Sequence, residues 1–67
     1  MKLYVARDKN GMLYLYIDEA IKRDDCWACS DPENMIEIDN KLFPNVKWED
    51  NEPTEVELTI KKKILMI

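Results

Sequence analysis

Apolar and polar residues alternate with a period of two from the first residues of the chain. In residues 2–8, one side carries Leu3, Val5 and Arg7, and the other carries Lys2, Tyr4 and Ala6. In residues 12–18, one side carries Leu13, Leu15 and Ile17, and the other carries Met12, Tyr14, Tyr16 and Asp18. A period of two is typical of a β-strand. The pattern therefore predicts that the fold starts with a β-hairpin of residues about 2–8 and 12–18.

The connection between these two strands contains the only glycine of the chain, Gly11, in an Asn-Gly pair. Asn-Gly between alternating runs is a strong hairpin indicator. A two-residue loop would place Val5 opposite Tyr16, whereas a three-residue loop with Gly11 in the left-handed region places Val5 opposite Leu15. Matched cross-strand pairs contribute roughly 0.2–1 kcal/mol each, so we expect the three-residue loop. Its pairs would be Leu3–Ile17, Val5–Leu15, Tyr4–Tyr16, Ala6–Tyr14 and Lys2–Asp18.

The middle of the chain predicts further short elements. Residues 18–25 are compatible with an irregular connection, with a helical turn after Asp18 or with a short edge strand at 20–23. The segments 26–29 and 35–39 flank a dense turn sequence, Asp31-Pro32-Glu33-Asn34, which favours a second hairpin built from these two segments.

Asp39 stands where its side chain could cap a short helical turn near residues 40–43. Pro44 would end that turn, because proline disfavours helical geometry in the residue before it. Such a turn would direct Leu42 and Phe43 inward, with Val46 and Trp48 following them.

The last strand is expected in residues 54–60, where Val56, Leu58 and Ile60 alternate with outward Glu55, Glu57 and Thr59. Residues 61–67 would extend this strand or cross another edge. One-sided strands of this kind belong to antiparallel sheets with one face in water. The fold class is therefore predicted to be mostly β: a single domain of residues 1–67 with a small antiparallel sheet of four or five strands and one short helical turn.

Composition removes most catalytic chemistry. The 67 residues are 46% hydrophobic, with no histidine, one serine (Ser30) and one glycine. This composition supports a folded chain but offers no nucleophile–base pair, no glycine-rich loop and no complete set of metal ligands. We therefore expect a non-enzymatic protein without catalytic residues and without a cofactor.

Charge is concentrated in one region. Residues 31–60 carry nine acidic side chains against Lys41 and Lys47, and three lysines follow at 61–63. Nucleic-acid binding depends on basic residues that neutralise phosphates, so this distribution points instead to a protein partner with a basic patch. The longest aliphatic run, residues 64–67, is far shorter than the roughly 20 residues that span a bilayer, and no secretory signal is recognisable. A cytoplasmic location without membrane contact is the expectation.

The cysteine pair has three possible roles. Cys26 and Cys29 have the spacing of a redox motif, but no amphipathic helix follows them, and Asp24 and Asp25 would raise rather than lower a thiol pKa. The pair could supply half of a zinc site shared between two chains, since structural zinc needs four ligands. The favoured interpretation is two structural thiols, with Trp27 and Cys29 on one face of a strand.

Two groups of residues are candidates for partner contact. Aromatic side chains and acidic loop residues suit binding and electrostatic steering, respectively; an acidic loop is also typical of a solvated surface. The candidates are Tyr4, Tyr14 and Tyr16 on one side of the first hairpin, and Glu49, Asp50 and Glu52 in the loop before the last strand. Both faces of that hairpin are apolar, and so short a chain has difficulty covering two faces. A homodimer is therefore also expected.

Three stretches of the sequence, residues 2–16 (KLYVARDKNGMLYLY), 37–50 (EIDNKLFPNVKWED) and 52–58 (EPTEVEL), resemble small uncharacterised proteins of gut bacteria and their prophages. They cover over half of the chain, and segment 18–34 fits the resemblance least. The resemblance implies an accessory, phage-associated setting in which small acidic proteins bind and modulate other proteins, and it transfers no functional residues.

Three functions follow as hypotheses. The first is a small non-enzymatic protein-binding or modulatory protein. The second is an acidic nucleic-acid mimic of the anti-defence type that occupies a basic groove. The third is a structural homo-oligomer. One contiguous acidic surface would favour mimicry, whereas an apolar patch would favour protein contact.

Overall fold

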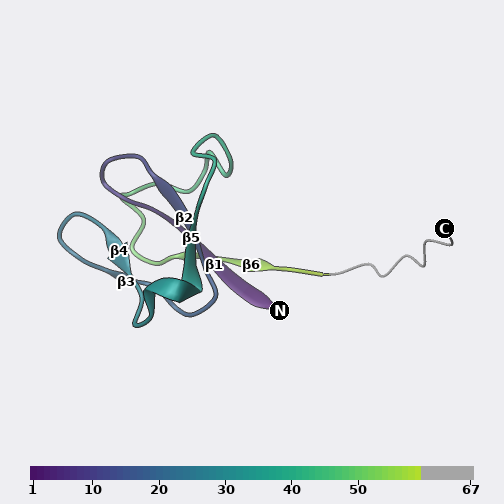
Figure 1. The fold of residues 1–67 in the computed structure, drawn as a ribbon. Helices are drawn as coiled ribbons and strands as arrows, with labels where there is room; N and C mark the ends of the chain where they lie inside the picture. The colour runs from purple at the N-terminus through teal and green to yellow at the C-terminus, as the bar shows by residue number, and fades with distance from the viewer. Residues whose placement is uncertain (60–67) are drawn as a thin grey trace, which may run out of the picture.

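The computed structural model describes residues 1–59, and the fold is mostly β, as predicted. Within these residues the elements are β1 (Lys2–Arg7), β2 (Leu13–Tyr16), β3 (Ile21–Lys22), β4 (Trp27–Ala28), the 3-10 turn η1 (Pro32–Asn34), β5 (Met35–Ile38) and β6 (Thr54–Glu57). The strands form a four-stranded sheet in the order β5-β2-β1-β6 and a separate two-stranded sheet of β3 and β4 (Figure 1). All strand pairs are antiparallel.

The first hairpin has the predicted register. Tyr4 lies opposite Tyr16, and Val5 lies opposite Leu15. The loop has three residues, since the Asp8 N–H donates to the Met12 carbonyl at 2.8 Å, and Gly11 has a φ of +93°. The sequence argument from cross-strand pairs is therefore confirmed for the ladder, although β2 ends at Tyr16 rather than near residue 18.

The prediction of a second hairpin from residues 26–29 and 35–39 is wrong. Residues 26–29 and 35–39 do not pair with each other: β4 pairs with β3, and β5 pairs with β2 at the edge of the main sheet. β3 corresponds to the short strand that the sequence left open for residues 20–23. The turn sequence after Ser30 forms η1 instead, where the Asp31 side chain accepts the Glu33 N–H at 3.0 Å and caps the turn. A local turn motif thus joins strands of two different sheets.

The helical turn expected near residues 40–43 is also absent. Asp39 does cap this region, but its carboxylate accepts the N–H of Lys41 and its carbonyl accepts that of Leu42. These bonds close a simple turn. Leu42 and Phe43 are not directed inward as predicted and are 48% and 41% exposed; Val46 alone of this stretch is buried.

The main sheet buries apolar side chains on both faces. We call one the tyrosine face; its sheet residues are Tyr4, Ala6, Tyr14, Tyr16 and Met35. We call the other the aliphatic face; its sheet residues are Leu3, Val5, Leu13, Leu15, Ile36, Ile38 and Val56. Each face has its own buried cluster, so the chain builds two small cores around one sheet.

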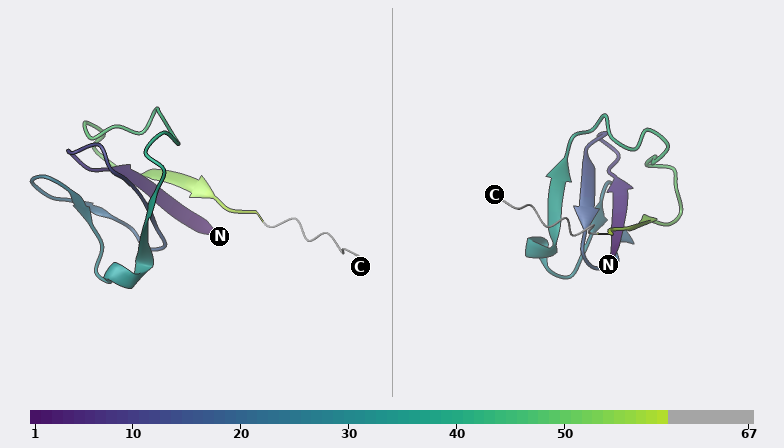
Figure 2. Two further views of the ribbon diagram at one scale, coloured as in Figure 1. Left: turned by 45° about the horizontal axis from the view of Figure 1, so that its top comes forward. Right: turned by 90° about the vertical axis from the view of Figure 1, so that its right-hand side faces the viewer.

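The β3–β4 hairpin covers the tyrosine face (Figure 2). Trp27 is 4% exposed and packs with Ala6, Tyr16 and Ala20. The hydroxyl of Tyr16 donates to the Trp27 carbonyl at 3.3 Å, and the Asp8 carboxylate accepts the Trp27 N–H at 2.9 Å. The backbone hydrogen bonds of Trp27 and the packing of its ring therefore attach the small sheet to the first hairpin.

A crossing segment, residues 39–53, connects the two edge strands of the main sheet. Figure 2 shows it passing over one end of the sheet from β5 to β6. Val46 packs on the aliphatic face against Val5 and Leu13, while Trp48 packs on the tyrosine face. This irregular segment consequently contributes to both cores.

The crossing segment is held by Arg7. Its guanidinium donates to the Val46 carbonyl at 2.7 Å, and to the Asn40, Leu42 and Phe43 carbonyls at 3.0, 3.2 and 3.3 Å. It also donates to the Gly11 carbonyl at 2.8 Å. One planar cation thus joins the first hairpin to the segment that packs on both faces.

A second cation secures the far part of the crossing segment. The Lys22 ammonium donates to the carbonyls of Trp48 (2.5 Å) and Asp50 (2.9 Å). It also lies 4.3 Å from the centre of the Trp48 ring and 5.6 Å from that of Trp27. These distances are within the range of cation–π attraction.

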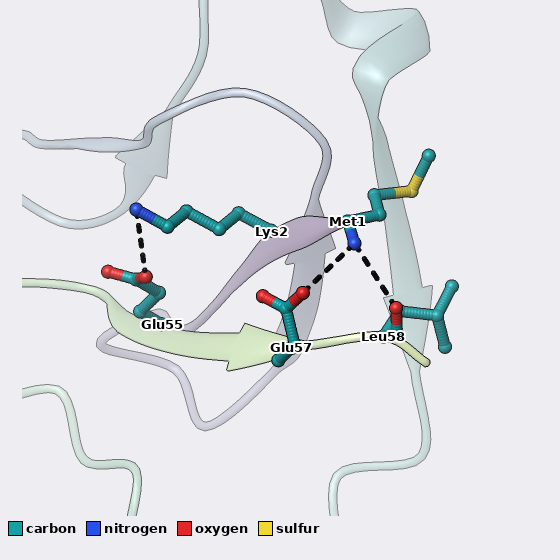
Figure 3. A network of polar contacts seen from close by, with 5 residues as sticks. All are labelled: Met1, Lys2, Glu55, Glu57 and Leu58. Atoms are coloured by element: carbon teal, nitrogen blue, oxygen red, sulfur yellow. Dashed lines mark hydrogen bonds and ion pairs between the residues drawn. The ribbon is translucent and has the colours of Figure 1, made fainter. Parts of the chain in front are cut away.

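β1 and β6 pair up to the first residue of the chain. The Leu58 N–H donates to the Met1 carbonyl at 2.8 Å, and the Met1 ammonium lies 3.1 Å from Glu57 Oε1 (Figure 3). Lys2 and Glu55 form a further exposed ion pair at 3.3 Å. The alternation predicted for Val56 is confirmed by its packing on the aliphatic face. The predictions for Ile60 and residues 61–67 lie outside the described residues.

Substituting Gly11 tests the hairpin loop. Nothing lies within 4 Å of an added Cβ at this position, so the cost of Gly11→Val is backbone strain at φ +93° and not a steric clash. We expect Gly11→Val to lower the free energy of unfolding by about 1–2 kcal/mol. Gly11→Asn should cost less, since asparagine tolerates the left-handed region better. Urea denaturation of both variants checks this; equal losses would contradict the strain argument.

Substituting Arg7 tests the attachment of the crossing segment. Arg7→Lys keeps the charge but loses the planar fork of donors, and we expect it to lower the free energy of unfolding by about 2 kcal/mol. Arg23→Lys is the matched control, because Arg23 is exposed and, within residues 1–59, its side chain forms no hydrogen bond with the crossing segment. Thermal or urea unfolding measures both, and equal stability of the two variants would show that Arg7 does not hold the segment.

Candidate functional site

The aliphatic face is covered over only half of its length. Val46 lies on the half near the Gly11 loop, where Val5 and Leu13 are fully buried. Toward Met1, no described segment crosses the sheet in this way, and Ile36 is 61% exposed. An exposed β-branched side chain on a sheet face is not unusual alone. Here Ile36 lines the same hollow as Met1 and Ile17, which are also exposed, although Leu3 in that hollow is only 7% exposed.

The aliphatic face contains two adjoining hollows. One, of about 430 Å³, is lined by Leu3, Leu15, Ile38, Leu42, Phe43, Val56, Glu57 and Leu58. The other, of about 350 Å³, is lined by Met1, Leu3, Leu15, Ile17, Glu33, Asn34, Met35 and Ile36. They share Leu3 and Leu15 at the middle of the sheet. We refer to the two together as the aliphatic groove.

Charged residues are found only at the rim of this groove. Glu33 belongs to η1 and Glu57 to the end of β6, and both are exposed. Neither an arginine nor a lysine lines either hollow. Met1 also lines the groove, and its ammonium pairs with Glu57. The groove therefore combines an apolar floor with a rim on which Glu33 suits an apolar ligand that carries positive charge beside it.

Phe43, which lines the groove, has an unusual backbone conformation. It has a φ of +48°, in the left-handed region, and within residues 1–59 it is the one non-glycine residue with positive φ. This conformation costs an aromatic residue about 1–2 kcal/mol. The Phe43 carbonyl accepts bonds from Arg7 and from the Val46 N–H, which hold it in place. Strain of this kind concentrates at functional sites, and here it positions an exposed aromatic ring at the groove.

The structure separates the three candidate tyrosines by burial. Tyr16 is 0% exposed beneath the β3–β4 hairpin and offers no surface to a partner. Tyr4 and Tyr14 are half-buried and pack against the same cluster. Burial raises the pKa of Tyr14, with a smaller contribution from the charge of Glu37. The tyrosine face is therefore mainly core.

The three candidate acids lie together in the crossing segment, but they differ in role. The Asp50 carboxylate accepts the Lys47 N–H at 3.0 Å and is half-buried, so it stabilises the turn of this segment. Glu49 and Glu52 are exposed. None of the three lines the aliphatic groove, which leaves Glu49 and Glu52 available for long-range attraction only.

Cys26 and Cys29 flank β4 as free, half-buried thiols. Cys29 packs against the cluster that contains Trp27, as the strand alternation predicted, and its thiol donates to the Asp31 carbonyl at 2.9 Å.

Residues 1–59 contain no cluster of three or more histidine, cysteine or acidic side chains arranged to hold a metal ion. In the same part of the chain, no helix has the length and apolar character that crossing a membrane requires. A third hollow, of about 410 Å³, lies beside the Gly11 loop and is lined by Asp8, Lys9, Asn10, Asp25 and Cys26. Its lining is polar, and Lys9 and Asp25 lie 3.7 Å apart across it.

Sequence reasoning identified both apolar faces of the first hairpin but missed Ile36, Leu42 and Phe43 as surface residues. Ile36 was placed in a second hairpin, and the other two were expected to point inward. A usable indication was present: Leu42, Phe43 and Pro44 form an apolar run inside a polar loop. Its exposure depends on how the crossing segment turns.

Comparisons of the chain with protein-family models, with curated proteins and with solved structures found no match.

The burial of Tyr16 predicts a pH dependence of stability. Burial raises the pKa of Tyr16 above its usual value near 10, with a further contribution from the charge of Asp8. The folded state therefore keeps the proton more tightly than the unfolded state, so this contribution is fully present below pH 10 and is lost as the pH rises above 10. We expect the free energy of unfolding in urea to fall more steeply between pH 9 and 11 for the wild type than for Tyr16→Phe. An equal loss of stability with pH in both proteins would contradict the assignment of this pH dependence to Tyr16.

Proposed function

We propose that this chain is a small non-enzymatic protein-binding domain that holds an apolar segment of a protein partner, flanked by basic residues, in the aliphatic groove. The observation that carries the proposal is the uncovered half of the aliphatic face. Contiguous exposed apolar surface is rare on monomeric domains and usually marks an interaction site. The function is modulatory and accessory, in the cytoplasm and in the phage-associated setting that the sequence resemblance implies.

The composition of the groove supports a protein ligand. Its floor consists of aliphatic side chains from β1, β2, β5 and β6, with the Phe43 ring at one end. Burying such a floor gains roughly 25 cal/mol per Å² of apolar surface. Its rim offers Glu33 to lysine or arginine side chains, whereas Glu57 is paired with the Met1 ammonium. This is the usual anatomy of a protein interface, with an apolar centre and a polar edge.

The acidic charge of the chain supports steering toward a basic partner. The net charge is −4, and Glu49 and Glu52 are exposed in the crossing segment. Charges outside the contact area raise association rates at low ionic strength more than they raise affinity. We assign these two acids to attraction over distance and the groove to the contact itself.

The pairing of acids with bases favours protein contact over mimicry of nucleic acid. Glu55 is paired with Lys2, Glu57 with the Met1 ammonium and Asp25 with Lys9. A nucleic-acid mimic needs a surface of uniform negative charge, and these pairs interrupt it. An apolar groove at the centre of the sheet also has no purpose in such a mimic.

Selection of peptides tests the proposed function. A peptide library displayed against the immobilised full chain should enrich apolar segments flanked by lysine or arginine. Ile36→Asp places a charge on the groove floor and should weaken the selected peptides at least tenfold, which corresponds to about 1.4 kcal/mol. Fluorescence anisotropy with a synthetic copy of the best peptide measures this.

Ile21→Asp is the matched control, because Ile21 is equally exposed at 63% but lies on β3, outside the groove. It should bind the selected peptides like the wild type. Enrichment of acidic or purely polar peptides, or equal weakening by the two variants, would contradict the proposal.

A further inference from the structure

The chemistry that the aliphatic groove requires is present in the chain itself. Residues 60–67, Ile-Lys-Lys-Lys-Ile-Leu-Met-Ile, combine five apolar side chains with three consecutive lysines. We infer that in the free protein the groove of each chain is occupied by residues 60–67 of a second copy, so that two chains form a homodimer by exchanging these segments. The inference rests on the proposed function, because it uses the same groove.

The described end of the chain lies at the groove. The backbone pairing of β6 with β1 ends where the Leu58 N–H bonds the Met1 carbonyl. Leu58 itself lines the groove and is 46% exposed. The residues that follow Leu58 in the sequence therefore begin beside an apolar surface.

The sequence at this point favours a second copy over the groove of the same chain. To lie in its own groove, the chain would have to reverse direction directly after Leu58. Thr59 and Ile60 are both β-branched, and neither is a turn residue. Such residues favour extended backbone. A segment that continued in this conformation would leave its own sheet and be available to a neighbouring molecule.

The dimensions agree with this arrangement. Eight extended residues span roughly 26–29 Å. Adjacent strands lie about 4.8 Å apart, so a segment of this length can cross a four-stranded sheet. Under two-fold symmetry each chain donates one segment and receives one, which makes the contact closed and limits it to a dimer.

Charge favours the same occupant. The groove rim carries Glu33 and Glu57, of which Glu57 is paired with the Met1 ammonium, while the segment carries Lys61, Lys62 and Lys63. Glu33 of one chain would thereby meet the basic segment of the other. Opposite charges at the rim of an apolar contact improve its specificity.

Measurement of mass in solution tests the dimer. The full chain should sediment at twice 8.0 kDa at micromolar concentration. Leu65→Asp in the segment and Ile36→Asp in the groove should each raise the dissociation constant of the dimer at least tenfold, whereas Ile21→Asp should leave it unchanged. A wild-type chain that stays at 8.0 kDa up to 100 µM, or a dimer that resists both groove and segment variants, would overturn the inference.

Nuclear Overhauser effects distinguish exchange between chains from folding within one chain. In a mixture of isotope-labelled and unlabelled full chains, filtered spectra record contacts between the two molecules only. We expect effects between the methyl groups of Ile64 or Leu65 of one chain and those of Leu15 or Ile36 of the other. The same effects found only within one chain would overturn the inference in favour of a self-covered monomer.

The two proposals fail separately. A monomeric chain that still binds the selected basic-apolar peptides overturns the segment exchange and keeps the proposed function. A segment-exchanged dimer for which peptide selection enriches nothing supports the exchange and overturns binding of a separate protein. In that case the structural homo-oligomer becomes the function of the fold.

Discussion

The hydrogen bonds of the Arg7 guanidinium are the interaction on which most of the tertiary structure depends. They fix the crossing segment, which contains no strand. Ordering each residue of such a segment costs roughly 1–2 kcal/mol in conformational entropy, and the hydrogen bonds to Arg7 offset part of this cost. Four carbonyls of this segment accept from Arg7, as does that of Gly11. An arginine suits this task because its planar fork of donors satisfies several carbonyls at once. The position of Val46 and the strained backbone of Phe43 both follow from it.

The same constraint explains why the candidate site is open. The crossing segment passes one end of the sheet, where Arg7 can reach it, and so covers only the half of the aliphatic face near Val5 and Leu13. The tyrosine face receives a different cover, the β3–β4 hairpin, which buries Tyr16 and Trp27. Two apolar faces therefore have unequal protection in one small domain. The uncovered half of one face becomes the surface that can bind a segment of another chain.

The candidate site was only partly predictable from the sequence. Period-two alternation indicates which side chains share a face, and it placed Leu3 and Leu15 correctly together and Val56 correctly inward. Alternation does not indicate which face is covered, because cover comes from segments that are distant in sequence. The tyrosines were therefore assigned to a contact surface although Tyr16 is core. Ile36 and Phe43 were assigned elsewhere, since the register of β5 and the turn of the crossing segment depend on long-range contacts.

By itself the sequence determined the β character of the chain, the three-residue loop at Gly11 and the register of the first hairpin. These features depend on neighbouring residues: the alternation of apolar side chains, one glycine and the cross-strand pairs that a short loop brings together. Tertiary structure decided the pairing of β5 with β2, the separate β3–β4 sheet and the exposure of the aliphatic groove. The reason is physical. A short apolar strand can satisfy its backbone against any free edge, and the edge it joins is selected by the packing of the whole chain.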